Sequence, residues 1–178
     1  VLAAGCRSRP SGVDYDQWKE AIETRRATAA RHVRAIPGFK VDLLRTAIKA
    51  EGSWVSLEFD GQGRLLIGRE GPGILRLTLP RRRLGRTYVE VVNDELNECR
   101  GLLWAHGSLY ANANNSKVSY RLRDTPGDDQ FDEVTLLRKT GGGVGHGRNS
   151  IALGPDGLIY LTHGNDVRLP EDFAPGPM

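Results

Sequence analysis

The stretch that decides the fold is Gly145-His146-Gly147-Arg148-Asn149-Ser150-Ile151-Ala152-Leu153-Gly154-Pro155-Asp156-Gly157-Leu158-Ile159-Tyr160-Leu161-Thr162-His163-Gly164-Asn165. Its centre, residues 154–157, predicts a tight turn, because proline presets φ and glycine accepts positive φ. The flanking residues 150–153 and 158–162 are mainly apolar or β-branched, which is typical of strands. The stretch therefore predicts a two-stranded ribbon, preceded by a glycine-rich run that carries one histidine.

The same layout occurs twice earlier in the chain, in residues 54–67 and 101–111. The turn glycines Gly63, Gly107 and Gly157 mark a repeat of roughly 40–50 residues. A repeat of this length made of short strands is typical of β-propeller blades. The sequence therefore predicts an all-β fold, a partial β-propeller of about two and a half four-stranded blades, with a short N-terminal helix.

The strands of the two complete blades can be assigned from apolar alternation. The first blade is expected to use residues 54–59, 64–68, 74–79 and 88–92, and the second 102–105, 108–113, 117–123 and 133–137. The third begins at Ser150. Phe39–Arg45 also alternates and predicts an outer strand.

We expect three parts: a signal remnant and linker over residues 1–13, the helix over 14–36, and the incomplete propeller over 37–178. A closed propeller needs about 4–8 blades, so we expect the remaining blades to lie outside this chain. Unpaired strand edges then predict that this piece alone aggregates or stays partly unfolded.

The N-terminal residues Val1-Leu2-Ala3-Ala4-Gly5-Cys6 look like the end of a lipoprotein signal, with Cys6 as the lipidated residue. This interpretation predicts an exported protein, periplasmic or anchored to a membrane by lipid; the alternative is an ordinary apolar N-terminus with a buried cysteine. The net charge of +3 does not indicate nucleic acid as a partner, because nucleic-acid binding needs basic residues clustered on one face. Cys99 is expected to be a small buried residue.

An acidic loop is a candidate calcium site. Asp124, Asp128 and Asp132 fall at positions 1, 5 and 9 of a glycine-kinked loop, and the carbonyl of Gln130 falls at position 7. Such alternating oxygen ligands suit Ca²⁺. Position 3 is Pro126, which has no side-chain ligand, so a solvated acidic turn between two outer strands stays open as the alternative.

His146 is the candidate catalytic residue. Histidine is the side chain that most often serves as a general base near neutral pH, and a loop at a strand entry can present it to a ligand. The other reading is an exposed or structural histidine. His32, His106 and His163 form no metal-ligand spacing with a cysteine or with each other.

Several segments together resemble a known family. They are Pro37-Gly38-Phe39-Lys40-Val41, Gly52-Ser53-Trp54-Val55-Ser56, Tyr120-Arg121-Leu122-Arg123-Asp124-Thr125, Gly127-Asp128-Asp129-Gln130-Phe131-Asp132-Glu133-Val134, and Leu153-Gly154-Pro155-Asp156-Gly157 with Gly164-Asn165 and Leu169-Pro170. From about Asp14 onward the chain resembles the propeller of bacterial exported proteins described as membrane-bound dehydrogenases or haem-binding-domain proteins. That family is similar to the soluble glucose/sorbosone dehydrogenases that depend on pyrroloquinoline quinone (PQQ).

The resemblance implies a hydride transfer from a sugar or alcohol hydroxyl carbon to PQQ. His146, eight residues before Gly154, matches the family's base, and Arg148 and Asn149 are the candidate cofactor contacts. It also implies a haem domain, absent from this sequence, as the electron acceptor, while calcium stays the possible cofactor that the acidic loop suggests. Ser150 stands where the family has an arginine that contacts the quinone. The alternative function is a non-catalytic propeller that binds carbohydrate or a protein partner.

Overall fold

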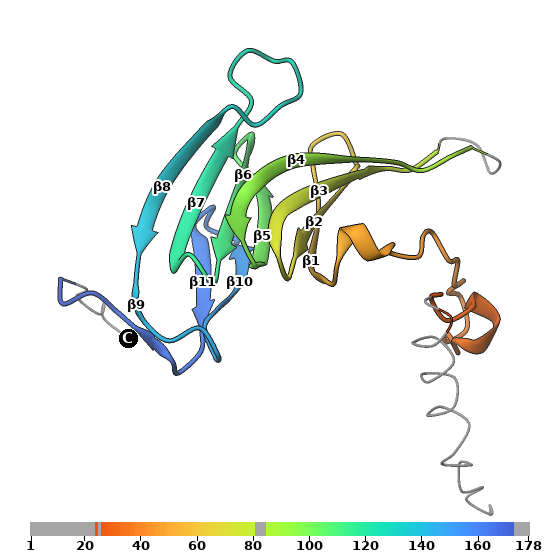
Figure 1. Ribbon diagram of the computed structural model, residues 1–178, viewed down its shortest axis with the longest axis horizontal. Helices are drawn as coiled ribbons and strands as arrows, with labels where there is room; N and C mark the ends of the chain where they lie inside the picture. The colour runs from red at the N-terminus through yellow and green to blue at the C-terminus, as the bar shows by residue number, and fades with distance from the viewer. Residues whose placement is uncertain (1–23, 25, 81–84, 173–178) are drawn as a thin grey trace, which may run out of the picture. The chain divides into compact units, whose positions relative to one another are not determined.

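The computed structural model describes residue 24 and residues 26–80 and 85–172, and the chain divides into two compact units, residues 1–49 and 50–178. The sequence predicted a boundary after residue 36. The second unit is built from antiparallel β-strands, which confirms the predicted all-β class for the described residues (Figure 1).

The second unit contains two four-stranded meanders, here called sheet 1 and sheet 2. Sheet 1 has the order β1 (Trp54–Phe59), β2 (Leu65–Arg69), β3 (Pro72–Thr78), β4 (Tyr88–Asn97). Sheet 2 has the order β5 (Cys99–Ala105), β6 (Ser108–Ala113), β7 (Val118–Arg123), β8 (Glu133–Lys139). All eight strands that the apolar alternation predicted are present, with small shifts at their ends.

The third repeat forms a two-stranded ribbon of β10 (Arg148–Leu153) and β11 (Ile159–His163). A short pair that the sequence did not predict, β9 (Gly141–Gly142) and β12 (Val167–Arg168), lies beside it. The first strand of the third repeat, β10, begins at Arg148, two residues before the predicted start at Ser150.

The three marker glycines occupy matching turns between the first two strands of each repeat. Gly63, Gly107 and Gly157 have φ of 76°, 66° and 77°, a region that side chains with a Cβ rarely adopt. The first and third turns also share their hydrogen bonds, since Asp60 N–H donates to Arg64 O at 2.9 Å and Gly154 N–H to Leu158 O at 2.8 Å. The predicted repeat is thus confirmed at its turns.

The three repeats lie side by side, with their first strands adjacent, because β1 and β2 pack on β5, and β5 and β6 pack on β10 (Figure 1). Between sheets 1 and 2 lies a fully apolar core that includes Leu66, Ile74, Cys99, Leu109 and Ala111. Cys99 is buried, as the sequence predicted, and its thiol is free where a disulfide with Cys6 had been open; burial raises the pKa of this thiol to about 12.

A smaller core joins sheet 2 to the ribbon, where Leu103 and Ala105 contact Ile151, with Tyr110 and Ile159 packed around them. One polar contact accompanies each apolar one. Ser56 Oγ donates to Cys99 O at 2.5 Å, and Asn112 Nδ2 donates to Asn149 O at 3.2 Å. A hydrogen bond from a polar side chain to a backbone carbonyl therefore links each repeat to the next.

An ion-pair network also connects sheets 1 and 2. Asp129, in the loop between β7 and β8, accepts from Arg64 and lies 3.0 Å from Arg76 Nη1. Arg76 is buried and also binds Glu90 at 2.6 Å, while Arg64 binds Asp60 at 2.6 Å. The two guanidinium groups, with the hydrogen bond from Arg64 first, hold the pKa of Asp129 below its usual range.

The first unit differs from its prediction. Residues 1–23 and 25 lie outside the described part, and residues 26–36 contain only the 3₁₀ turn η1 (Ala30–His32), so the expected helix does not extend to residue 36. The second 3₁₀ turn, η2 (Lys49–Glu51), spans the unit boundary. The strand expected over Phe39–Arg45 is wrong, because those residues pair with no strand in the described structure.

Candidate functional site

The candidate site lies at one end of the repeats, opposite the marker turns. Two loops meet there: the His146 loop, residues 140–147 between β8 and β10, and the facing loop, residues 164–166 between β11 and β12. Gly143 N–H donates to Asp166 O at 2.8 Å and Gly164 N–H donates to Gly147 O at 2.7 Å. Backbone hydrogen bonds therefore join the two loops, although only two residues of the His146 loop belong to a strand.

The His146 imidazole is exposed, and its orientation is set by the facing loop. Nδ1 lies 2.9 Å from Asn165 Oδ1, and the backbone N–H of His146 donates to Asp166 Oδ2 at 2.8 Å. Because an amide oxygen only accepts, this contact favours the tautomer in which Nδ1 carries the proton, and in the neutral ring Nε2 then keeps its lone pair. The structure thus presents Nε2 as a hydrogen-bond acceptor at the surface.

Gly164 makes this approach of the loops feasible. A Cβ at that position would stand 2.1 Å from His146 O and 2.9 Å from the Cβ of His146. Any larger residue would push the two loops apart. The glycine that precedes Asn165 is therefore as necessary to the geometry as the asparagine itself.

Arg148, the expected cofactor contact, is instead an internal residue. It is 1% exposed, and its guanidinium donates to Thr140 Oγ1 at 2.7 Å, Gly143 O at 2.9 Å and Gly141 O at 2.6 Å. Burial lowers its pKa, and every hydrogen-bond partner of the guanidinium is neutral. The side chain thus fastens the His146 loop to β10, and it does not present a free cation at the surface.

Asn149, the second expected cofactor contact, is half-buried. Its backbone carbonyl accepts from Asn112 Nδ2, and a Cβ at Gly101 would stand 2.2 Å from the same oxygen. In the structure, Asn149 therefore joins the ribbon to sheet 2 through its main chain.

The sequence missed a buried polar group beneath the His146 loop. Asn114 is fully buried, and its Nδ2 donates to Glu98 Oε2 at 2.9 Å and Val144 O at 2.8 Å. Its Oδ1 accepts the backbone N–H of Arg148 at 2.9 Å. Arg100 pairs with Glu98 and donates to Gly145 O at 2.9 Å. The only signal was a run of asparagines, residues 112, 114 and 115, at the end of an apolar strand.

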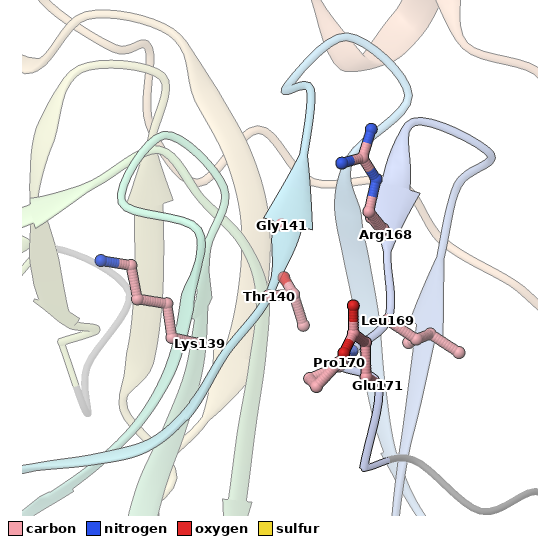
Figure 2. A pocket seen from close by; sticks show the side chains of 7 residues that line it. All are labelled: Lys139, Thr140, Gly141, Arg168, Leu169, Pro170 and Glu171. Atoms are coloured by element: carbon pink, nitrogen blue, oxygen red, sulfur yellow. The ribbon is translucent and has the colours of Figure 1, made fainter.

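A shallow groove of about 450 Å³ lies beside the carbonyl partners of Arg148. Figure 2 shows the side chains that line it. They are Lys139, Thr140, Gly141, Arg168, Leu169, Pro170 and Glu171. The Lys139 and Arg168 side chains point in different directions, so the groove presents no converging pair of cations to an anionic ligand (Figure 2).

The candidate calcium loop is held by its own hydrogen bonds. Asp124 accepts the backbone N–H groups of Gly127 at 2.7 Å and Asp129 at 2.8 Å, and Asp132 accepts the backbone N–H of Thr125 at 2.8 Å. The hydroxyl and backbone of Thr125 lower the pKa of Asp132.

Asp128, another predicted ligand, also accepts a backbone N–H group. Asp128 Oδ1 accepts the backbone N–H of Gln130 at 3.1 Å. Among residue 24 and residues 26–80 and 85–172, no three His, Cys, Asp or Glu side chains gather as a metal site. The described residues therefore do not gather Asp124, Asp128 and Asp132 as a metal site, and calcium binding by this loop stays a prediction.

Cys6, the predicted lipidation site, lies outside the described residues. Within the part of the chain that the structure describes, no helix is both long enough and apolar enough to cross a membrane.

Comparisons with known proteins give no family. No protein-family model matches the sequence, and no curated protein matches it. Two solved structures are similar in fold, an iodide structure and a calcium structure of the Trichoderma reesei Carbohydrate-Active Enzymes Family AA12. Their TM-scores are 0.46 and 0.45 at 20% and 21% identity, over 60% of this chain. The matched part spans only 28% and 27% of those chains.

Proposed function

We propose that this chain is part of the β-propeller of an exported, dehydrogenase-like protein that acts on a sugar or alcohol hydroxyl, with His146 as the base. The proposal combines the sequence resemblance with one structural observation. That observation is the exposed imidazole of His146, whose Nδ1 is bound by Asn165 Oδ1 at 2.9 Å.

The repeat geometry supports a propeller. Across sheet 1, apolar residues occupy one cross-strand row, Leu57, Ile67, Leu75 and Val91. The matching row of sheet 2 is Leu102, Ala111, Tyr120 and Leu136. In sheet 2 this row faces sheet 1, since Leu102 and Ala111 belong to the core between the two sheets. The matching row of sheet 1 lies on its other face, where Ile67 and Leu75 are buried and Leu57 and Val91 are exposed, so successive sheets repeat the same apolar pattern as blades do.

The chemistry assigned to this chain is one proton transfer. A substrate hydroxyl that donates to His146 Nε2 would pass its proton to that nitrogen, and the hydride on the carbon would leave to a quinone-class acceptor held elsewhere in the protein. The Nδ1–H···Oδ1 bond to Asn165 keeps the ring in the tautomer that leaves Nε2 free, and Asp166 fixes the loop through the backbone N–H of His146. Positioning of this kind holds a base in reach of the hydroxyl without a search of conformations.

The residues expected to hold a quinone do not fit one. PQQ carries several carboxylates, which require free cations or N–H donors. Arg148 is buried and its donors are taken by Thr140, Gly141 and Gly143, and the side chains of Lys139 and Arg168 do not converge. We therefore assign no step of the reaction to the quinone in this chain.

The test is dye-linked dehydrogenase activity of the full-length protein with added PQQ and Ca²⁺, on aldoses and primary alcohols. His146→Ala should lower kcat/KM by about 10²–10⁴-fold, the usual contribution of a positioned acid or base. The control is His106→Ala, a histidine at the opposite end of the repeats whose ring contacts Gly157 O at 3.1 Å. Activity that survives in His146→Ala removes the mechanism.

The burial of Arg148 favours a second function, a non-catalytic propeller that binds carbohydrate. In that case His146 Nε2 accepts a hydrogen bond from a sugar hydroxyl and no oxidation follows. Titration calorimetry with oligosaccharides separates the two functions. Binding that is lost in His146→Ala, in a protein with no dehydrogenase activity under any quinone, identifies the binding function.

A further inference from the structure

We propose that Asn114 is a positioning residue for His146, and that Glu98 and Arg100 hold it in that role. The kinetic consequence rests on the proposed function, since it concerns the residue assigned as the base. The geometric part is a buried support that fixes the orientation of one imidazole, and it does not depend on what that imidazole binds.

The side-chain amide of Asn114 holds the His146 loop on both sides of the histidine. Before it, Nδ2 donates to Val144 O at 2.8 Å, and after it, Oδ1 accepts the backbone N–H of Arg148 at 2.9 Å. A Cβ at Gly147 would overlap Oδ1, so the loop passes directly over the amide. One fully buried side chain therefore fixes the backbone two residues before and two residues after His146.

The orientation of the Asn114 amide is itself fixed by Glu98. Nδ2 donates its other hydrogen to Glu98 Oε2 at 2.9 Å, and the backbone N–H of Asn114 donates to Glu98 O at 3.0 Å. A flipped amide would place its oxygen against two acceptors, Glu98 Oε2 and Val144 O, and its NH₂ group against the N–H of Arg148. The amide thus has one orientation that satisfies all three of its side-chain contacts.

Glu98 connects this amide to the junction between sheets 1 and 2. It is the single residue between β4 and β5, it is 7% exposed, and its backbone N–H donates to Gly71 O at 3.2 Å. Its φ is 53°, in the left-handed region that residues with a Cβ rarely adopt. Backbone strain of this kind persists where the surroundings fix it, and it gathers at functional sites. The strained residue here is the one whose carboxylate reaches the support of the His146 loop.

Arg100 completes the network beside the histidine. Its Nε and Nη2 donate to Glu98 Oε1 at 2.9 Å and 2.6 Å, and its Nη1 donates to Gly145 O at 2.9 Å. The planar guanidinium presents these donors in a fixed fork, so it sets the carboxylate and the loop carbonyl relative to each other. Together with Asn114, it holds the loop at the residue that directly precedes His146.

The network matters to the base because the ring contact is short. His146 Nδ1 lies 2.9 Å from Asn165 Oδ1, and a shift of the loop by about 1 Å takes the pair beyond hydrogen-bond distance. The ring then populates both neutral tautomers, and Nε2 loses its set direction. A misplacement of about 1 Å at a reacting group can cost roughly 10²-fold in rate.

The test compares Asn114→Ser with a matched control, Asn112→Ser, in the full-length protein. Both asparagines are fully buried in the same part of sheet 2. Asn112 accepts from Ser119 Oγ at 2.5 Å and donates to Asn149 O at 3.2 Å, so it contacts the ribbon and not the His146 loop. Each variant removes one buried amide, and thermal melting measures the stability that each loses.

The readout is the tautomer ratio of the His146 ring, measured by long-range ¹H–¹⁵N NMR on protein with ¹⁵N-labelled histidine. The signal is assigned by its loss in His146→Ala. Asn112→Ser should keep the Nδ1–H form, and Asn114→Ser should show both tautomers in comparable amounts. Arg100→Met, at a side chain that is 28% exposed, should shift the ratio in the same direction. Where oxidation is measured, kcat should fall about 10–100-fold in Asn114→Ser, with KM little changed.

A folded Asn114→Ser protein with the wild-type tautomer ratio overturns the proposal. An equal change of the ratio in Asn112→Ser overturns it as well, because the amides would then act through stability alone. If Asn114→Ser does not fold, Arg100→Met decides, and an unchanged ratio there sinks the idea. A wild type without dehydrogenase activity removes the proposed function, and the tautomer ratios alone then decide whether Asn114 positions the ring.

Discussion

Nδ1 of His146 lies 2.9 Å from Oδ1 of Asn165, although the two residues are 19 positions apart and both strands of the ribbon lie between them. The ribbon is thus a spacer that brings an amide oxygen to an imidazole. An amide oxygen accepts only, so the contact selects one tautomer of the ring without adding charge.

The first prediction concerns that tautomer. In Asn165→Ala the ring loses its acceptor, and both neutral tautomers should become populated where the wild type has the Nδ1–H form. Long-range ¹H–¹⁵N NMR of the ring nitrogens measures their ratio directly. Asn165→Asp retains an acceptor oxygen and should retain the Nδ1–H form. An unchanged ratio in Asn165→Ala would show that the contact does not orient the ring.

The second prediction concerns the ion pairs between sheets 1 and 2. Asp129→Asn leaves the buried guanidinium of Arg76 with Glu90 alone. A broken buried pair costs several kcal/mol, but Asp129 is 42% exposed, so we expect about 1–2 kcal/mol after screening by solvent. Urea denaturation measures the change. Asp128→Asn alters the neighbouring acid, which binds only a backbone N–H, and should cost less than 0.5 kcal/mol or so.

The same aspartate gives stability a pH dependence with a definite sign. Arg64 and Arg76 lower the pKa of Asp129 from 3.8 in the folded state. A carboxyl with a lowered pKa contributes stability above its unfolded pKa, and the contribution is lost as the pH falls below that value. The wild type should therefore lose more stability than Asp129→Asn does between pH 5 and pH 3 or so.

The third prediction concerns His163 in the ribbon. Burial, and then the positive charge of Arg148, lower its pKa from 6.5. The unfolded chain therefore binds a proton that the folded chain resists, and the free energy of unfolding should decrease as the pH falls through 6.5. His163→Gln should flatten this slope in denaturation curves recorded from pH 5.5 to pH 8 or so. In His106→Gln the slope should match that of the wild type, and a slope that survives in His163→Gln assigns it to another group.

The fourth prediction concerns the marker turns. Gly157 has φ of 77°, so Gly157→Ala should cost about 1–2 kcal/mol of stability, although a Cβ there meets open space. Gly71→Ala is the matched control, because a Cβ at that position also meets open space and the backbone is outside the left-handed region. Thermal melting should show the difference, and equal melting temperatures for the two variants would contradict the backbone argument.

The strands could be predicted because their signals are local. Alternation and a glycine turn lie within a dozen residues of each other, as in residues 150–162, and the structure has a strand on each side of that turn. Phe39–Arg45 shows the limit, since alternation says that a segment can form a strand but names no partner to pair with.

The site was less predictable, because its chemistry depends on the direction in which each side chain points. Spacing located His146 at a loop, but nothing in the sequence shows that the Arg148 guanidinium turns inward to Thr140 and two backbone carbonyls. Spacing likewise matched Asp124 to a calcium loop, but it could not show that this carboxylate accepts the backbone N–H groups of Gly127 and Asp129.

Cys99 has a practical consequence. Its sulfur lies in the core between sheets 1 and 2, and its thiol stays protonated at neutral pH, so alkylating reagents cannot reach or react with it in the closed molecule. In a Cys6→Ser background, the rate of its labelling would report each moment at which the two sheets separate. Cys99 is thus a built-in probe of transient opening between the first two repeats.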